Sequence, residues 1–328
     1  MSVLVDARGV TKHFRLGRGQ TVHAVDDFSL TIAAKEIVGL VGESGSGKST
    51  FGRTLIGLHA KTAGDVYFDG EKLPQLYTPV DFRRYARQMQ MIFQDPYSSL
   101  NPRMTVGEII GEGLRLHSSL TAAAIRDEVG LWLERVGLER NHASRYPHEF
   151  SGGQRQRVGI ARALIVGPRF VVCDEPISAL DVSVQAQIVR LLGELKESLG
   201  LTMLFIAHDL SMVRYVSDRM AVMYMGSLVE LGTADEVYFE PLHPYTQTLI
   251  ASNPQPDPKA ERARATIPIN GEITSPVNIG PGCRFAKRCP RVMDVCRTVT
   301  PQLRAVGGVA ERLVACHLYE PATARSDA

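Results

Sequence analysis

The chain has 328 residues, of which 44% are hydrophobic and 22% are charged, and its formal net charge is +2. These values are typical of a globular protein with room for one large domain and an appendage. The small net charge argues against nucleic acid as the main partner. No apolar run approaches the roughly 18 residues of a membrane-spanning helix. The first residues lack the pattern of a secretory signal, so we expect a cytosolic protein in which disulfides rarely persist.

Apolar patterns alternate along most of the chain. Residues 28–32 alternate between apolar and polar side chains, which predicts a half-buried strand. The continuous apolar run at 37–41 predicts a buried parallel strand, and 64–70 predicts another strand between turn residues. Further along we expect, in order, a helix over 121–138, a strand at 170–173, a helix over 184–199 and a strand at 203–207. Strand–helix–strand alternation of this kind predicts an α/β sheet.

The stretch GESGSGKST (42–50) fits the pattern G-x-x-x-x-G-K-[ST], and it lies between an apolar run and a predicted helix over 50–58. The backbone N–H groups of such a turn bind phosphate. We expect Lys48 to reach the β- and γ-phosphates of a nucleoside triphosphate and Ser49 to bind Mg²⁺. This turn by itself leaves kinases, GTPases, helicases and transport ATPases open. The residues predicted to hold the nucleotide are Gly42, Ser44, Gly45, Gly47, Lys48, Ser49 and Thr50.

A second, acidic motif reduces the number of protein classes that remain possible. In RFVVCDEP (169–176) an apolar strand ends at Asp174, which can hold Mg²⁺ through water. The adjacent Glu175 can act as the general base that activates an attacking water. An exposed acidic turn after a strand is the alternative interpretation. Together with the glycine-rich turn, the motif indicates hydrolysis of the nucleotide rather than transfer to an acceptor.

The stretch FSGGQRQRVGIARAL (150–164) predicts a basic helix whose N-terminus offers N–H donors to a second phosphate. A capped surface helix is the alternative. In combination with the two preceding motifs, this stretch resembles the signature of the ATP-binding cassette (ABC) family, and the resemblance spans roughly residues 3–250. The signature residues are Phe150, Ser151, Gly152, Gly153 and Gln154.

Four further positions resemble family motifs in the expected order. Phe14 matches the aromatic residue that stacks on adenine, and Gln94 matches the glutamine that contacts Mg²⁺ and the attacking water. Asp181 belongs to a stretch similar to the family's D-loop, and His208 matches the histidine that contacts the γ-phosphate. The resemblance implies ATP and Mg²⁺ as cofactors. The catalytic residues that it implies are Glu175, His208, Gln94 and Lys48.

The resemblance also implies the fold, an α/β P-loop ATPase core with an antiparallel β subdomain and a helical subdomain at about 80–165. We expect the ATPase domain at 1–251, a proline-rich linker at 252–282 and a small Cys-rich C-terminal extension at 283–328. In the family, residues that correspond to Ser151 and its glycines act on the nucleotide of a second subunit. The chain is therefore expected to work as a dimer.

Several stretches resemble the ATPase subunits of oligopeptide and dipeptide importers, namely 97–109, 145–157, 175–188 and 241–250. This resemblance implies an ATPase that energises peptide import as a peripheral protein at the cytoplasmic face of the cell (inner) membrane. The implied partners are a second, homologous ATPase subunit in a heterodimer, two membrane permeases and an extracytoplasmic solute-binding protein, without nucleic acid. Nickel chelates, glutathione and sugars are alternative solutes. A non-transport ABC ATPase is less favoured, because the chain shows neither tandem cassettes nor a long coiled coil.

Four of the five cysteines lie in the C-terminal part of the chain, while Cys173 lies in a predicted strand as a small buried residue. Four thiols in a short cytosolic segment favour a metal over disulfides, and the metal would supply the fold of a segment too small to bury much core. The close cysteine pairs typical of zinc are missing. The spacing and the importer resemblance favour a [4Fe–4S] cluster, with Zn²⁺, aided by His317, as the alternative and free thiols as the third option. The predicted ligands are Cys283, Cys289, Cys296 and Cys316.

Overall fold

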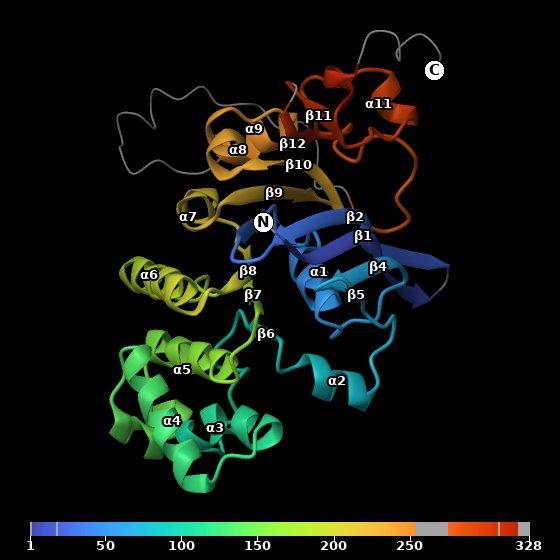
Figure 1. Cartoon of the computed structure of the whole chain (residues 1–328). Helices are drawn as coiled ribbons and strands as arrows, with labels where there is room; N and C mark the ends of the chain where they lie inside the picture. Colours follow the sequence, from blue (N-terminus) through green and yellow to red (C-terminus); the bar gives the residue numbers. More distant parts are fainter. Residues whose placement is uncertain (1, 18, 253–274, 308, 321–328) are drawn as a thin grey trace.

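The computed structural model describes residues 2–17, 19–252, 275–307 and 309–320 (Figure 1). Within these residues the strands form two sheets, one of eight strands and one of four. Most of the predicted proline-rich linker, 253–274, lies outside the described residues, as does the end of the predicted extension, 321–328. Among the described helices, none combines the length and the apolar content that crossing a bilayer requires.

The larger sheet has the strand order β11-β12-β10-β9-β3-β8-β7-β6, and the five strands from β9 to β6 run parallel. Strands β3, β7 and β8 are buried along their whole length, as parallel strands covered on both faces are. The predicted α/β sheet with buried strands is thus confirmed. The parallel strands are β3 (Ile37–Val41), β6 (Met89–Ile92), β7 (Phe170–Asp174), β8 (Thr202–Ile206) and β9 (Arg219–Tyr224).

The smaller sheet is antiparallel, with the order β2-β1-β4-β5. Along β2, residues 28–32 alternate between buried and exposed, as their sequence predicts. The ring of Phe51 in helix α1 (Lys48–Leu55) lies 4.3 Å from the ring of Phe28, and both belong to one apolar cluster with Leu40 of β3. Helix α1 is therefore held between the two sheets. The strands are β1 (Val3–Gly17), β2 (Gln20–Ala33), β4 (Ala63–Phe68) and β5 (Glu71–Lys72).

Helices α3, α4 and α5 pack together at the end of the molecule that is lowest in Figure 1. Before this layer, the hydroxyl of Tyr85 in α2 donates to Glu71 of the small sheet, and β6 pairs with β7 in the large sheet. The elements are α2 (Pro79–Tyr85), α3 (Val106–His117), α4 (Ala122–Arg135), η1 (Arg140–Ser144), η2 (Pro147–Glu149) and α5 (Gly152–Leu164).

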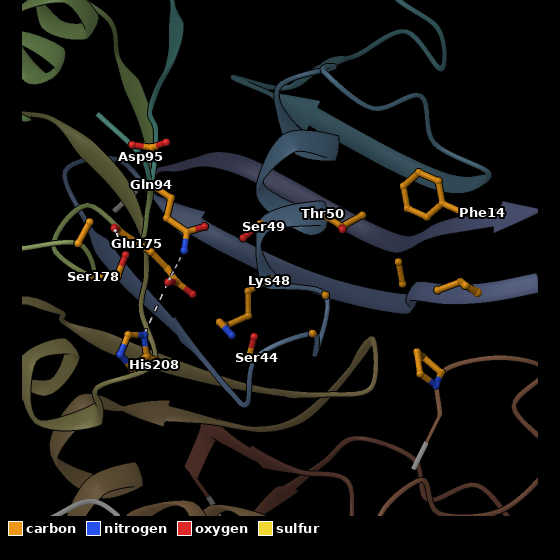
Figure 2. A pocket seen from close by; sticks show the side chains of 16 residues that line it. Phe14, Ser44, Lys48, Ser49, Thr50, Gln94, Asp95, Glu175, Ser178 and His208 are labelled. Atoms are coloured by element: carbon orange, nitrogen blue, oxygen red, sulfur yellow. Dashed lines mark hydrogen bonds and ion pairs between the residues drawn. The ribbon is translucent and has the colours of Figure 1, made fainter. Parts of the chain in front are cut away.

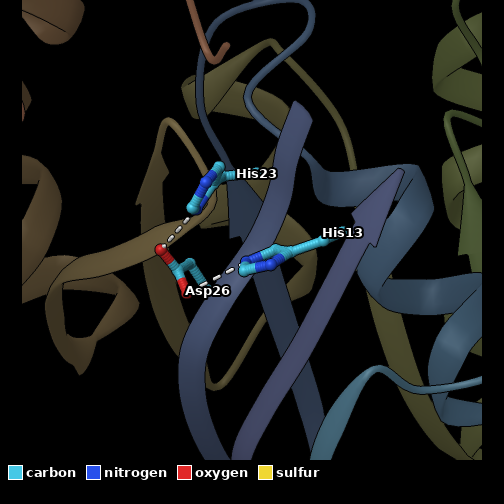
Figure 3. Close-up of side chains that lie close together, drawn as sticks. All are labelled: His13, His23 and Asp26. Carbon is cyan, nitrogen blue, oxygen red and sulfur yellow. Dashed lines mark hydrogen bonds and ion pairs between the residues drawn. The ribbon is translucent and has the colours of Figure 1, made fainter. Parts of the chain in front are cut away.

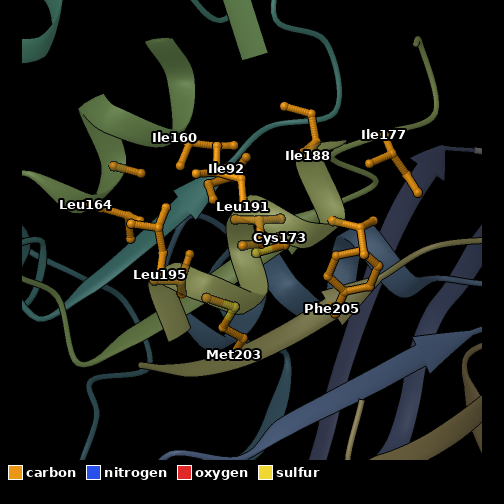
Figure 4. Close-up of a cluster of buried hydrophobic side chains, with 14 of the residues drawn as sticks. Ile92, Ile160, Leu164, Cys173, Ile177, Ile188, Leu191, Leu195, Met203 and Phe205 are labelled. Carbon is orange, nitrogen blue, oxygen red and sulfur yellow. The ribbon is translucent and has the colours of Figure 1, made fainter. Parts of the chain in front are cut away.

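A buried apolar cluster joins α5 and α6 (Val182–Leu199) to the large sheet (Figure 4). Leu164 of α5 and Leu191 of α6 lie in this cluster together with Cys173 of β7. Cys173 is fully buried, as predicted, and burial raises the pKa of its thiol to about 12. The cluster ties the helix that carries the signature to the strand that ends at Asp174.

The C-terminal extension continues the large sheet, because β12 (Val309–Val314) pairs with β10 (Ser227–Thr233) and with β11 (Arg304–Val306). The ring of Phe285 is only 1% exposed and lies 5.3 Å from the ring of Tyr224 and 5.4 Å from that of Tyr245. This segment therefore packs on the rest of the chain through the edge of β10 and through the rings of Tyr224 and Tyr245. The remaining helices are α7 (Leu210–Val216), α8 (Ala234–Phe239), α9 (Pro244–Ala251), α11 (Val295–Thr298) and η3 (His317–Tyr319).

Candidate active site

The glycine-rich turn joins β3 to α1 and is pressed against two other strands. Gly47 has φ 108°, and a Cβ atom there would lie 1.9 Å from the carbonyl oxygen of Ala24 in β2. Gly42 has φ 154°, and a Cβ atom there would lie 2.2 Å from the carbonyl oxygen of Met223 in β9. Only glycine fits these two positions. The close approach fixes the turn while the first residues of α1 line a pocket.

Lys48 is buried in this turn with 4% exposure. Its Nζ donates to the carbonyl oxygens of Gly42 at 2.8 Å and Glu43 at 2.9 Å. Burial lowers the pKa of the ammonium group, whereas the carboxylates of Glu175 and Asp174 raise it. Phosphate oxygens are stronger partners for an ammonium group than neutral carbonyls. Lys48 is therefore positioned to bind phosphate in exchange for these carbonyl contacts.

Ser49 and Asp174 bring the start of α1 to the end of β7. The Ser49 hydroxyl donates to Asp174 Oδ1 at 2.6 Å, and Nη2 of Arg53 lies 3.4 Å from Oδ2. Asp174 is fully buried, which raises the pKa of its carboxyl group, while Ser49 and Arg53 lower it. Hydroxyl and carboxylate oxygens are ligands that Mg²⁺ prefers, so this pair fits the predicted Mg²⁺ site.

Glu175, Gln94 and His208 meet at one end of the pocket (Figure 2). Gln94 Nε2 donates to Glu175 Oε2 at 2.9 Å, and His208 Nδ1 lies 3.7 Å from the same oxygen. Glu175 has φ 45°, a backbone conformation that non-glycine residues rarely adopt and that is often found at functional sites. Its N–H donates to the carbonyl oxygen of Ile206, which holds this conformation. The carboxylate is thus oriented into the pocket as a general base requires.

The pocket has a volume of about 880 Å³, and Phe14 lies at the end opposite to Glu175 (Figure 2). Val22 pairs with Phe14 across the small sheet, and Ala24 and Pro276 also line the pocket, so this part of the wall is apolar and suits a nucleobase. The residues predicted to bind phosphate and the residue predicted to bind the base thus occupy opposite ends of one pocket. The predicted residues that line it are Phe14, Ser44, Gly45, Gly47, Lys48, Ser49, Thr50, Gln94, Glu175 and His208.

The signature residues do not line this pocket. Ser151 caps α5, where its Oγ accepts from the N–H of Gln154 at 3.3 Å and Gln154 Oε1 accepts from the N–H of Ser151 at 3.0 Å. A Cβ atom at Gly153 would lie 2.5 Å from Cγ1 of Val184, so the signature packs on the start of α6. Asp181, which precedes α6, is likewise absent from the pocket lining. One chain carries a phosphate pocket and, apart from it, a helix terminus able to bind phosphate.

The pocket lining also includes residues that the sequence motifs do not predict. Asp95 and Ser178 line it beside Gln94 and Glu175, and their nearness in sequence to those motif residues is the signal that would have found them. Pro276 has no such signal. Its carbonyl oxygen accepts from the N–H of His23 at 2.9 Å, so its place depends on how residues 275–278 run along β2.

The four cysteines predicted as metal ligands line one small cavity in the extension. Burial raises the pKa of Cys289, and it raises the pKa of Cys283 to about 12 and that of Cys316 to about 11. Among the described residues, a single group of three or more His, Cys, Asp or Glu side chains has all its ligand atoms within 4.8 Å of one another, and this group contains no cysteine. The four sulfurs therefore share a cavity without forming a cluster of that tightness.

This sheet order, with a phosphate-binding turn at one place and a signature helix at another, is that of an ATP-binding cassette ATPase. Comparison with known protein families supports the same class. Residues 25–178 match the family described as ABC transporter, and residues 229–296 match the family described as oligopeptide/dipeptide transporter, C-terminal region.

Relatives with similar sequences and a solved structure with a similar fold support the same family. The oligopeptide transport ATP-binding protein OppF of Salmonella typhimurium is 47% identical over 97% of both chains, and OppF of Bacillus subtilis is 57% identical over 80% of this chain and 86% of its own length. A solved ATP-binding cassette dimer in a post-hydrolysis state with ADP and Pi has a TM-score of 0.65 and 30% identity, covering 70% of this chain and 99% of that one. The chain belongs to the ABC transporter family, in the branch of the oligopeptide transport ATP-binding proteins.

Proposed function

We propose that this chain hydrolyses ATP to energise the import of di- and oligopeptides through a multi-subunit ABC importer. The observation that carries the proposal is the union, in one chain, of a hydrolytic nucleotide pocket with a C-terminal region that matches oligopeptide/dipeptide transporters. The OppF relatives, similar over most of their length, are named for oligopeptide transport. Importers of nickel chelates, glutathione or sugars are the alternative.

The two ends of the pocket bind different parts of ATP. Phe14 stacks on the adenine, and Lys48 binds the β- and γ-phosphates in place of the carbonyl contacts that it makes in this structure. Ser49 and Asp174 hold Mg²⁺, which supplies charge stabilisation for the phosphates when bound. The remaining glycine-rich turn binds phosphate through its N–H groups.

Hydrolysis uses the three residues that meet at the other end. Glu175 accepts the proton of a water molecule that lies between its carboxylate and the γ-phosphate. Gln94, which donates to Glu175 in this structure, orients that water. His208 is 61% exposed at the pocket, and it contacts the γ-phosphate from its side of the site.

The signature acts on ATP held by a second subunit. The N-terminus of α5 lies outside the pocket of its own chain, and Ser151 is exposed there. Ser151, Gly152 and Gly153 supply N–H groups and a hydroxyl to the γ-phosphate across the interface, with Gln154 and Asp181 at its edge. Each dimer then contains two composite sites, so hydrolysis depends on dimer formation.

Movement passes from the γ-phosphate to the helical layer through the segment after Gln94. The guanidinium of Arg155 in α5 lies 3.7 Å from the centre of the Tyr97 ring, and Arg162 donates to the carbonyl oxygen of Ser99. A displacement of Gln94 on loss of the γ-phosphate therefore moves α5 and the helices packed on it.

We further propose the assembly and the division of the chain. The partners are a second, homologous ATPase subunit, two membrane permeases and an extracytoplasmic solute-binding protein, and the chain sits peripherally on the cytoplasmic side of the cell membrane. The ATPase domain occupies 1–251, followed by the linker at 252–282 and the extension at 283–328. The pairing of β12 with β10 supports an extension that is docked on the ATPase domain.

The import function is tested by reconstituting the chain with its permeases and partner ATPase in lipid vesicles. We expect the binding protein loaded with a di- or oligopeptide to raise the rate of phosphate release and to drive ATP-dependent peptide uptake. If the binding protein stimulates phosphate release when it is loaded with a nickel chelate, glutathione or a sugar, but not with a peptide, the transported solute is not a peptide.

The four cysteines of the extension are proposed to hold a [4Fe–4S] cluster. Tetrahedral zinc, with Zn–S bonds of about 2.3 Å, needs its sulfurs about 3.8 Å apart. No three of the cysteine sulfurs lie within 4.8 Å of one another, although all four line one cavity. A [4Fe–4S] cluster takes one cysteine per iron, and the four cysteines around one cavity supply that set of ligands. The bound group would also offset the thiolate charges that this buried setting disfavours.

Replacing Cys289 with Ser is expected to remove the cluster. Anaerobically purified protein should show a broad absorption near ~400 nm and about four iron and four sulfide per chain, and the variant should lose all three. Cys173→Ser is the control, because Cys173 lies in β7 away from the cavity and should leave the iron content unchanged. One zinc per chain without iron would contradict the cluster.

A further inference from the structure

The turn between Cys283 and Cys289 carries an arginine that reaches the glycine-rich turn of the ATPase core. Arg288 is 5% exposed, and its Nη1 and Nη2 donate to Oε2 and Oε1 of Glu43 at 2.9 and 3.0 Å. The hydrogen bonds that Arg288 donates to the Glu43 carboxylate raise the pKa of Arg288. A two-pronged pair between arginine and carboxylate is strong and fixes the orientation of both groups. The pair thus joins two segments that are 245 residues apart in sequence.

Glu43 belongs to the glycine-rich turn and contacts Lys48, which lines the pocket. Its carbonyl oxygen accepts from Lys48 Nζ at 2.9 Å, and its N–H donates to the hydroxyl of Tyr245 at 2.8 Å. Its carboxylate contact comes from Arg288 of the extension. The place of the carbonyl that holds Lys48 is therefore set in part by a residue of the extension.

A second arginine anchors the same turn of the extension at another point. Arg284 pairs with Asp26 of β2, which also lies 3.2 Å from Nε2 of His13 and 3.1 Å from Nδ1 of His23 (Figure 3). Burial acts to raise the pKa of Asp26, but its hydrogen bonds with His23 and Arg284 lower it overall. The Asp26 carboxylate thus pairs with Arg284 and contacts two histidine rings, and the Arg284–Asp26 pair anchors the extension to β2.

The position of Arg288 depends on the cysteine site. The carbonyl oxygen of Cys283 accepts from the N–H of Ala286 at 3.0 Å, and that of Phe285 accepts from the N–H of Arg288 at 2.9 Å, which makes a tight turn. The N–H of Cys283 donates to the carbonyl oxygen of Cys296 at 2.8 Å and ties this turn to another cysteine. A change at the cysteine cavity therefore moves the backbone that presents Arg288.

We propose that Arg288 is a positioning residue for ATP binding, which makes the phosphate-ready geometry of the glycine-rich turn depend on the cysteine site of the extension. Through Glu43, Arg288 holds the carbonyl oxygen that keeps Lys48 in place. Loss of the cysteine site releases Arg288, loosens the turn and weakens ATP binding. The second half of this inference rests on the proposed function of the cysteines, whereas the first half does not.

Replacing Arg288 with Met tests the positioning role in the full-length chain with its partners. We expect the Kd of a fluorescent ATP analogue and the KM for ATP to rise about tenfold, within the range typical of coupling between two sites, while kcat stays unchanged. Glu43→Gln should have the same effect, and the double variant should be no worse than either single one, because each change removes the same contact. Arg288→Lys keeps the positive charge but cannot make the bidentate contact with the carboxylate, so it should give an intermediate Kd.

Lys287→Met is the matched control, since Lys287 is the exposed neighbour of Arg288 in the same turn. It should leave Kd and KM unchanged. If Arg288→Met lowers the melting temperature but leaves Kd and KM unchanged, the pair is only structural and the proposal is wrong. Should Arg288→Met fail to fold, Arg288→Lys and Glu43→Gln decide the same question.

The dependence on the cysteine site is tested by a double-mutant cycle. Cys289→Ala is expected to raise the Kd of the ATP analogue by the same factor as Arg288→Met, and the two changes together should raise it no further. Fully additive effects would overturn the connection through Arg288. Iron and sulfide contents are measured on the same samples. If no iron is found but Arg288→Met still raises the Kd, the proposed cluster is wrong and the positioning role of Arg288 is retained.

Discussion

Replacing Glu175 with Gln is expected to lower the kcat of ATP hydrolysis by about 10²- to 10⁴-fold, the range typical of general-base catalysis. The amide cannot accept the proton of the attacking water, but it has the shape of the carboxylate and can keep the contact with Gln94. ATP binding should therefore persist, and ATP should accumulate uncleaved on the dimer. Phosphate release at saturating ATP and the amount of bound ATP per chain measure the two effects.

The matched control is Glu197→Gln on α6. Glu197 is a glutamate with 77% exposure that pairs with Lys196 far from the pocket lining, so its loss should leave kcat unchanged. A Glu175→Gln variant that releases phosphate near the rate of the unchanged protein would show that another group activates the water.

Replacing Lys48 with Met is expected to weaken ATP binding by about 30- to 4,000-fold, because removing one partner of a desolvated charge pair costs about 2–5 kcal/mol. Lys48 is the ammonium group held by the carbonyl oxygens of the glycine-rich turn, and Met fills much of the same space without charge. Titration with a fluorescent ATP analogue measures the loss. Phosphate release should fall with it at ATP concentrations near the original KM.

Lys61→Met provides the control for burial. Lys61 is also a buried lysine whose pKa is lowered by burial, and its Nζ donates to the carbonyl oxygens of Leu73 and Pro74 outside the pocket. Its loss should lower the melting temperature and leave the Kd for ATP unchanged. Equal losses of ATP affinity in the two variants would show that Lys48 acts through stability rather than through phosphate.

Much of the pocket could be predicted from local sequence. The turn at 42–50 and the acidic end of β7 carry their chemistry in adjacent residues, and a buried parallel strand before each of them has a recognisable apolar run. The structure brings Lys48, Gln94, Glu175 and His208 into one pocket, as these motifs predict. The pairing of β6 with β7 could not be predicted in this way, because the two strands are about eighty residues apart and local periodicity carries no signal for such a pairing.

The amino-acid sequence by itself determined the class of the protein and its nucleotide, because short motifs carry these properties in neighbouring side chains. Only the tertiary structure showed that the extension packs against the ATPase core. Pro276 joins the wall near Phe14 by pairing along β2, and Arg288 reaches Glu43 across 245 residues. Contacts of this kind arise from packing between segments distant in sequence, where neither period nor spacing carries a signal, so they become visible only when the chain is folded.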